Sequence, residues 1–253
     1  AGPAMTLGVR GRAGAVATTA GASVPSPLGS PKIPSTQADI FGIGDAEVAR
    51  RLEMVQCLVA KPAPASDPEP ALIGDSIYVG NKYHVADVAL LRRLGVTGVL
   101  NCASGGIRSL PLDEYEESGI QYAFTNVAQD AHDYPILHGR SGFRSDHLDA
   151  AYTFYKGAVA KGGKALFFCV AGQNRSATLA IAVLLLKGQS LEAVLTVCAR
   201  VRPFVVENTG FQRQLIELEA LLGGRRGGTS GGDTGGAKRP KVDPVAARAL
   251  ADA

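Results

Sequence analysis

The chain has 253 residues, of which 46% are hydrophobic and 19% are charged. This apolar fraction is sufficient for a packed core and excludes a wholly disordered protein, and no apolar run approaches the roughly 20 residues of a membrane span. The formal net charge of +3 arises from the two ends of the chain, because the stretch between them is slightly acidic. Residues 1–38 (three basic, no acidic) and 224–253 (six basic, three acidic) each carry +3, whereas residues 39–223 hold 17 basic and 20 acidic residues. A nucleic-acid-binding core would be basic, so no nucleic-acid partner is expected.

The two ends of the chain are predicted to be disordered. Residues 1–38 are rich in Ala, Gly, Ser, Thr and Pro without apolar periodicity, and they are interpreted as a flexible leader, with an organelle transit peptide as the alternative. Residues 224–253 contain seven glycines and form a predicted basic tail. Its cluster at 238–241 fits either a nuclear import signal or a solvated tail, so a cytoplasmic or nuclear location is expected.

Residues 39–70 are expected to form a short helix and a linker. Asp45 is a suitable N-cap, and Val48, Leu52, Val55 and Val59 recur at helical spacing, which predicts a helix over 45–59. Residues 61–70 contain four prolines, which exclude a continuous helix and favour a linker.

From residue 71 to 223 the sequence becomes dense and periodic. The predicted strands are 77–79, 96–100, 120–124 and 164–168; the predicted helices are 85–94, 146–160, 176–186, 190–201 and 209–222. This alternation predicts one α/β domain, with a small, largely parallel central sheet flanked by helices. Four cysteines without a C-x-x-C pair are interpreted as reduced thiols, and no metal site is predicted.

The chemistry is expected at Cys169. This residue follows the buried strand 164–168, Gly172 provides backbone freedom for a tight loop, and Arg175 precedes the apolar helix. Consecutive backbone N–H groups and the positive end of a helix form an anion cradle, which also favours a thiolate. The Arg175 guanidinium matches two phosphate oxygens. The predicted phosphate-binding residues are Val170, Ala171, Gly172, Gln173, Asn174 and Arg175.

In these features the chain resembles the dual-specificity branch of the cysteine-dependent protein tyrosine phosphatases. The family signature H-C-x-x-G-x-x-R-S is matched from Cys169 to Ser176. Segments 77–80, 94–101 and 202–215 resemble the opening strands and the closing segment of the family. The resemblance therefore covers most of residues 71–223 and implies the cysteine-phosphatase fold.

The resemblance implies a two-step hydrolysis without metal or cofactor. Cys169 would attack phosphorus to form a phosphocysteine, and Ser176 would help the sulfur to leave again. Asp130 matches the family position of the general acid, and Asp133 is the rival. The expected substrate is a phosphoprotein carrying phosphotyrosine, with phosphoserine and phosphothreonine as an extension.

Two departures from the family pattern keep alternatives open. Phe168 stands where the family has His before the nucleophile, and the 39 residues from Asp130 to Cys169 exceed the usual spacing by a handful. These departures motivate a pseudophosphatase that binds phosphorylated partners without turnover. A phosphatase of phosphoinositide, phosphoglucan or RNA 5′ phosphate is the third hypothesis, although the uncharged loop residues 170–174 argue against polyanionic substrates. The sequence predicts no oligomeric state.

Overall fold

The computed structural model describes residues 41–59, 61–103, 110–139, 144–160 and 162–226, with side chains up to residue 223. The predicted leader, the transit-peptide alternative, the import signal and nearly all of the predicted tail lie outside these residues. In the described part of the chain, no helix combines the length and the apolar character needed to cross a bilayer.

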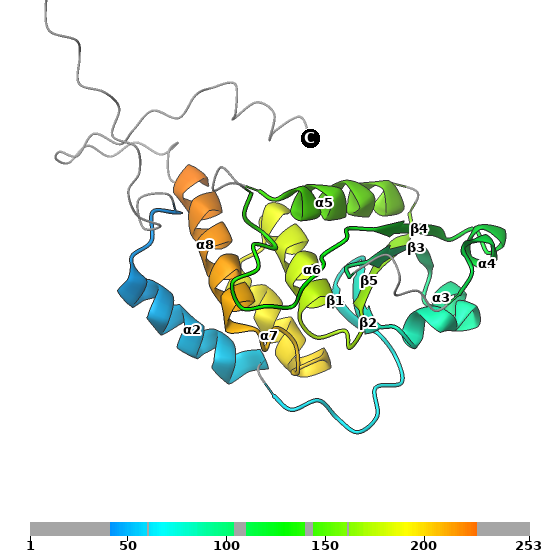
Figure 1. Cartoon of the computed structure of the whole chain (residues 1–253), viewed down its shortest axis with the longest axis horizontal. Coiled ribbons are helices and arrows are strands. Elements are labelled where there is room, and N and C mark those ends of the chain that lie inside the picture. The colour runs from blue at the N-terminus through cyan, green and yellow to red at the C-terminus, as the bar shows by residue number, and fades with distance from the viewer. Residues whose placement is uncertain (1–40, 60, 104–109, 140–143, 161, 227–253) are drawn as a thin grey trace, which may run out of the picture. The chain divides into compact units, whose positions relative to one another are not determined.

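A five-stranded sheet forms the centre of the domain, in the order β1-β2-β5-β3-β4 (Figure 1). The strands are β1 (Ala71–Gly74), β2 (Ile77–Asn81), β3 (Val96–Asn101), β4 (Gln121–Phe124) and β5 (Lys164–Cys169). Strands β2, β5, β3 and β4 are parallel, and β1 pairs with β2 in the antiparallel direction. The predicted α/β class with a largely parallel sheet is confirmed; the edge strand β1 was not predicted.

Strand β5 lies in the middle of the sheet and is buried on both faces. Ala165 and Phe167 belong to one hydrophobic cluster, and Leu166 and Phe168 belong to another on the opposite face. Parallel strands that are covered on both faces are continuously apolar and do not alternate between apolar and polar residues. Residues 165–168 follow this continuous pattern. The carboxyl end of β5 is thereby fixed at the centre of one sheet edge.

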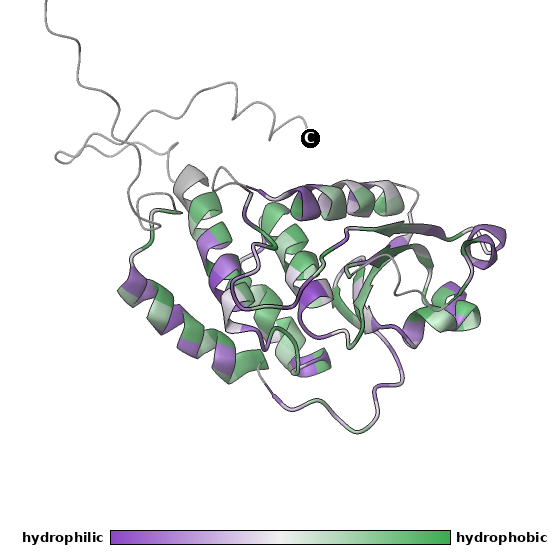
Figure 2. Cartoon of the chain, in the orientation of Figure 1, coloured by the Kyte–Doolittle hydropathy of each residue, from purple (hydrophilic) through white to green (hydrophobic). Residues whose placement is uncertain are grey.

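Helices cover one face of the sheet in two tiers. Helices α5 (Asp146–Val159) and α6 (Arg175–Leu186) contact the central strands, α7 (Leu191–Val201) contacts β1 and α6, and α8 (Thr209–Arg226) packs against α6 (Figure 1). Ten consecutive residues of α6 are buried, and Figure 2 shows this helix as predominantly hydrophobic. Helix α6 is therefore the core helix that supports the loop before it.

The opposite face carries two short helices, α3 (Val88–Arg93) and α4 (Leu112–Glu117). The predicted helix over 85–94 is wrong in its first half, where a 3-10 turn (His84–Ala86) precedes α3. The Asp87 side chain accepts a hydrogen bond from the Leu90 N–H at 2.8 Å and caps α3, so the helix begins after residue 87. Helix α4 was not predicted.

Helix α2 (Asp45–Val59) forms as expected and packs against α7 and α8. Val48, Val55 and Val59 are buried in the same cluster as the core of α6. Arg51 also forms an ion pair with Glu219 of α8. Helix α2 is therefore part of the packed structure.

Truncation of Val55 tests this role of α2. Val55→Ala removes two buried methyl groups and should lower the free energy of unfolding by about 0.5–3 kcal/mol. The neighbouring Gln56→Ala is the matched control, because Gln56 is exposed on the same helix. Chemical denaturation of both variants measures the difference; equal midpoints would show that α2 does not contribute to the core.

Candidate active site

Cys169 is the last residue of β5 and the first of a loop that ends where α6 begins at Arg175. We call residues 169–175 the cysteine loop. Its position at the carboxyl edge of parallel strands is where α/β sheets place their ligands. The predicted strand, loop and helix around the nucleophile are all present.

The carbonyl groups of the cysteine loop are held from outside by Arg202. Its Nε donates to the Gly172 carbonyl at 3.0 Å, and its Nη2 donates to the Ala171 carbonyl at 3.4 Å. Arg202 lies between α7 and α8 and is 1% exposed. Two successive peptide groups of the loop are thus oriented by a single guanidinium.

Backbone N–H groups hold the two flanking carbonyls of the same loop. Lys82 N–H donates to the Val170 carbonyl at 3.3 Å, and Val206 N–H donates to the Gln173 carbonyl at 2.9 Å. In a trans peptide the C=O and the following N–H point in opposite directions. With the carbonyls of four consecutive peptides turned outward, the N–H groups of residues 171–174 are directed inward, where they can bind an anion.

One of these anchors is itself in an unusual conformation. Val206 has a φ of 53°, which is a rare and strained region for a β-branched residue. Its carbonyl accepts a hydrogen bond from Gln212 Nε2 at 2.7 Å, so both sides of the residue are fixed. The strain is located where the chain supports the cysteine loop.

Gly172 is required at its position for two separate reasons. Its φ of 69° lies in the left-handed region that favours glycine. A Cβ atom here would also collide with the Gly80 carbonyl at the end of β2 and would lie 2.7 Å from Arg202 Nη2. The tight turn of the cysteine loop therefore depends on close approach to the neighbouring strand.

The nucleophile and its hydroxyl partner are adjacent. Cys169 Sγ lies 3.3 Å from Ser176 Oγ, and both residues are buried. A hydroxyl at this distance can donate a hydrogen bond to a sulfur anion. This contact is the geometry that the predicted role of Ser176 in releasing the sulfur requires.

Arg175 has an unused donor. Its Nη1 donates to the Val127 carbonyl at 3.3 Å, which anchors the side chain, while its buried Nε finds no hydrogen-bond partner among the described residues. A buried N–H without a partner is costly, and an anion in the cradle would satisfy it. The same residue also opens α6, so its charge adds to the positive end of the helix.

Asp130 is held beside the cysteine loop by two side-chain amides. Asn174 Nδ2 donates to its Oδ2 at 3.2 Å, and Asn208 Nδ2 donates to its Oδ1 at 3.2 Å. The Asn208 N–H in turn donates to Asn174 Oδ1 at 3.1 Å. Asp133 is exposed and has no side-chain hydrogen bond to a described residue. Of the two candidate acids, the structure brings only Asp130 to the cysteine loop.

Two thiols meet at this edge of the sheet, but their electrostatic settings differ. Cys102 follows β3, and its N–H donates to the Phe168 carbonyl at 2.7 Å. Burial raises the pKa of Cys102 well above its ordinary value; nearby Cys169 raises it further, and Arg175 offsets only part of the effect. Cys102 therefore stays a neutral thiol at physiological pH, and Cys169 remains the candidate nucleophile of the site.

Phe168 is a core residue on the face of the sheet that carries α3 and α4. It is fully buried, and its ring centroid lies 6.3 Å from that of Tyr122. An apolar ring offers no hydrogen bond to the cysteine loop, as expected. The carbonyl groups of the loop are held by the external donors described above.

Arg202 and Asn208 are site residues that sequence reasoning did not assign. They were noted only as part of the closing segment of the family. Arg202 donates to the carbonyls of the cysteine loop, and Asn208 donates to Asp130, 78 positions away. An arginine just before a proline and an asparagine before a helix were visible in the sequence, but their partners depend on the tertiary fold.

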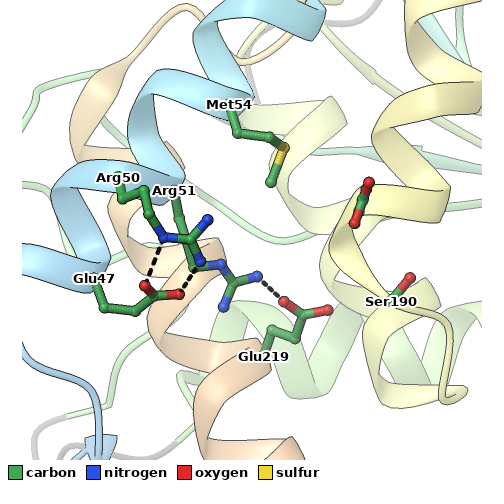
Figure 3. A pocket seen from close by; sticks show the side chains of 7 residues that line it. Glu47, Arg50, Arg51, Met54, Ser190 and Glu219 are labelled. Atoms are coloured by element: carbon green, nitrogen blue, oxygen red, sulfur yellow. Dashed lines mark hydrogen bonds and ion pairs between the residues drawn. The ribbon is translucent and has the colours of Figure 1, made fainter.

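A polar hollow also lies between α2, α7 and α8 (Figure 3). Arg50 pairs with Glu47 at 2.6 Å, and Arg51 pairs with Glu219, so both arginines of the hollow are already paired with carboxylates. Ser190 at its rim follows the C-terminal end of α6, whereas the cysteine loop precedes the N-terminal end. A helix of 12 residues spans about 18 Å, so the hollow is separate from the site.

Comparison with known families agrees with this geometry. A family model described as "Dual specificity phosphatase, catalytic domain" matches residues 77–220. The chain belongs to this family.

Curated members of the dual specificity phosphatase family show the same relationship. Dual specificity protein phosphatase 26 from human and from cattle is 35% identical over 149 residues, covering 58% of this chain. The aligned part spans 65% of the length of those relatives. Dual specificity protein phosphatase 1 of Arabidopsis thaliana is 27% identical over 198 residues, which cover 77% of this chain and 92% of that protein.

Solved dual specificity phosphatases share the fold. A mouse putative dual specificity phosphatase complexed with zinc tungstate aligns with a TM-score of 0.53 and 24% identity, over 66% of this chain and 96% of that one. Human DUSP28 aligns with a TM-score of 0.51 and 24% identity, over 61% and 99%. At this identity the likeness concerns the fold.

Alanine at Gly172 tests the close approach of the cysteine loop to β2. Gly172→Ala should lower stability and weaken binding of inorganic phosphate by more than tenfold, roughly the loss of one charge-assisted hydrogen bond. Gly119→Ala is the control, because Gly119 has a φ of 70° but open space around its Cβ, so it isolates the conformational cost of about 1–2 kcal/mol. Thermal melts and phosphate titration of both variants separate the two effects; equal losses would contradict the steric argument.

Proposed function

We propose that residues 71–223 form a catalytic unit that hydrolyses phosphotyrosine in phosphoproteins, and phosphoserine and phosphothreonine as further substrates. The observation that carries this proposal is the cysteine loop itself. Support comes from the Cys169 thiol at the start of a loop whose carbonyl groups are held outward, and from the Arg175 Nε, which has no hydrogen-bond partner among the described residues. Membership in the dual specificity phosphatase family supports the same reaction.

The first step transfers the phosphoryl group to sulfur. Arg175 and the N–H groups of residues 171–174 bind the phosphate oxygens and stabilise their charge as the transition state develops. The Cys169 thiolate attacks phosphorus while the bond to the leaving oxygen breaks. Asp130 in its acid form donates a proton to that oxygen, so a neutral phenol or alcohol departs.

The second step returns the enzyme to its starting state. The Asp130 carboxylate accepts a proton from water as the water oxygen attacks phosphorus, and the S–P bond breaks to release inorganic phosphate. Ser176 Oγ, 3.3 Å from Cys169 Sγ, donates a hydrogen bond to the departing thiolate. One reaction cycle thus uses all four residues, Cys169, Arg175, Asp130 and Ser176.

The thiol chemistry also suggests where the reaction occurs. Cys57, Cys102, Cys169 and Cys198 are all free. Free thiols are kept reduced in the cytoplasm and the nucleus. We therefore place the phosphoprotein substrates in these compartments.

Replacement of the nucleophile tests the proposed reaction. Cys169→Ser should reduce hydrolysis of p-nitrophenyl phosphate by more than about 10³-fold, because a serine hydroxyl is not ionised at neutral pH. Cys57→Ser is the control, since Cys57 is exposed on α2 and should leave turnover unchanged. If the wild-type protein bound a phosphopeptide but released no phosphate, the chain would instead be a phospho-binding module.

The leaving group distinguishes the two candidate acids. Asp130→Ala should slow phenyl phosphate, whose leaving oxygen needs a proton, by about 10²–10⁴-fold and slow p-nitrophenyl phosphate far less. Asp133→Ala is the matched control three residues away and should leave both rates near wild type. Rate ratios for the two substrates provide the measurement, and the reverse pattern would move the acid role to Asp133.

A further inference from the structure

The Pro-rich segment 61–70 carries a carboxylate that reaches the support of the cysteine loop. Asp67 Oδ1 accepts from Arg202 Nη1 at 2.8 Å, and Asp67 Oδ2 accepts from Arg202 Nη2 at 2.6 Å. The Asp67 side chain is 21% exposed and that of Arg202 is 1% exposed. This bidentate pair joins residues 135 positions apart, and no residue of the segment was assigned to the site from the sequence.

Asp67 is fixed on its other side by the end of β2. Asn81 Nδ2 donates to Asp67 Oδ2 at 2.8 Å, and His84 Nε2 lies 2.8 Å from the Asp67 carbonyl. The Asn81 N–H donates to His84 Nδ1 at 3.0 Å, which places the proton of the neutral ring on Nε2. Asn81 and His84 therefore hold Asp67 in place in addition to its contacts with Arg202.

The plane of the Arg202 guanidinium has little freedom. The Phe204 ring lies 4.4 Å from Arg202 Cζ, and Asp67 occupies the two terminal nitrogens. The Nε–H and the second N–H of Nη2 then meet the carbonyls of Gly172 and Ala171. A guanidinium is a rigid fork, so fixing one edge fixes the direction of the other donors.

We propose that Asp67 is a positioning residue for phosphate binding, acting through Arg202 to hold the Ala171 and Gly172 carbonyls outward and their following N–H groups toward the anion. This inference rests on the proposed function, because it concerns the same cysteine loop. The positioning segment lies before the residues that match the family model, which begin at 77. This chain therefore supports its cysteine loop with a carboxylate from outside the matched domain.

The electrostatics of the pair agree with this role. Burial acts to raise the pKa of Asp67, but the Arg202 guanidinium outweighs it and holds the pKa below its usual range. A group with a lowered folded-state pKa contributes stability above its unfolded pKa of about 3.9 and loses it as the pH falls through the folded value. The pair is therefore intact throughout the pH range in which a phosphatase would be assayed.

The same segment offers a matched control. Glu69 lies two residues from Asp67 and pairs with Arg93 at 2.7 Å, and both of these side chains are at least half exposed. Such a surface pair contributes little to stability. Glu69→Gln removes the same charge from the same segment without touching the cysteine loop.

The experiment compares full-length wild type with Asp67→Asn, Asp67→Glu and Glu69→Gln. Affinity for inorganic phosphate is measured by calorimetry well below each melting temperature, and kcat and KM are measured with p-nitrophenyl phosphate. Asp67→Asn should weaken phosphate binding about tenfold, as expected when one amide contact to an anion is misdirected. Asp67→Glu should restore part of the affinity, and Glu69→Gln should match wild type.

The outcomes separate this inference from the proposed hydrolysis. Weaker phosphate binding in Asp67→Asn supports the positioning role even if no variant turns over substrate, in which case the hydrolytic function alone fails. If Asp67→Asn bound phosphate as tightly as Glu69→Gln does and only its melting temperature were lower, Asp67 would be a structural residue and the inference would be overturned. The same holds if the wild type does not bind phosphate at all.

Discussion

The whole site depends on turning four consecutive carbonyl groups away from the place where an anion binds. A peptide group cannot present its N–H inward unless its carbonyl finds a donor outside, because an unsatisfied buried carbonyl is costly. Here the donors come from the end of β2 and from Arg202 and Val206 in the connection between α7 and α8, two parts of the chain that are distant in sequence. The fold brings these hydrogen-bond donors together around the carbonyl groups of the cysteine loop.

The same arrangement separates the charges that the proposed chemistry needs. Arg175 and the start of α6 lie at the end of the loop that begins with Cys169, while burial keeps the neighbouring thiol of Cys102 neutral. The carboxyl group of Asp130 is held at the cysteine loop by uncharged amide donors. Anion, nucleophile and acid can therefore share a small volume, in which the buried Nε of Arg175 is available to the anion.

Local patterns were sufficient to predict the central strands, the core helix and the loop that joins them. Residues 164–186 carry that information themselves, since strand, glycine, arginine and apolar helix are contiguous. What could not be predicted depends on contacts between distant segments, such as Asp67 with Arg202 or Asn208 with Asp130. The short elements β1 and α4 were missed for a related reason, because their residues are stabilised by neighbours and not by their own periodicity.

The Asp67–Arg202 pair has a consequence for how the chain behaves when an anion arrives. Thermodynamic coupling is reciprocal, so any docking of segment 61–70 that favours phosphate binding must be favoured by phosphate to the same degree. Most of this segment's side chains are exposed, and its proline-rich backbone belongs to no helix or strand. Binding of substrate or product would thus hold segment 61–70 more firmly against the domain. Occupancy of the cysteine loop could therefore be measured as resistance of this segment to proteolytic cleavage.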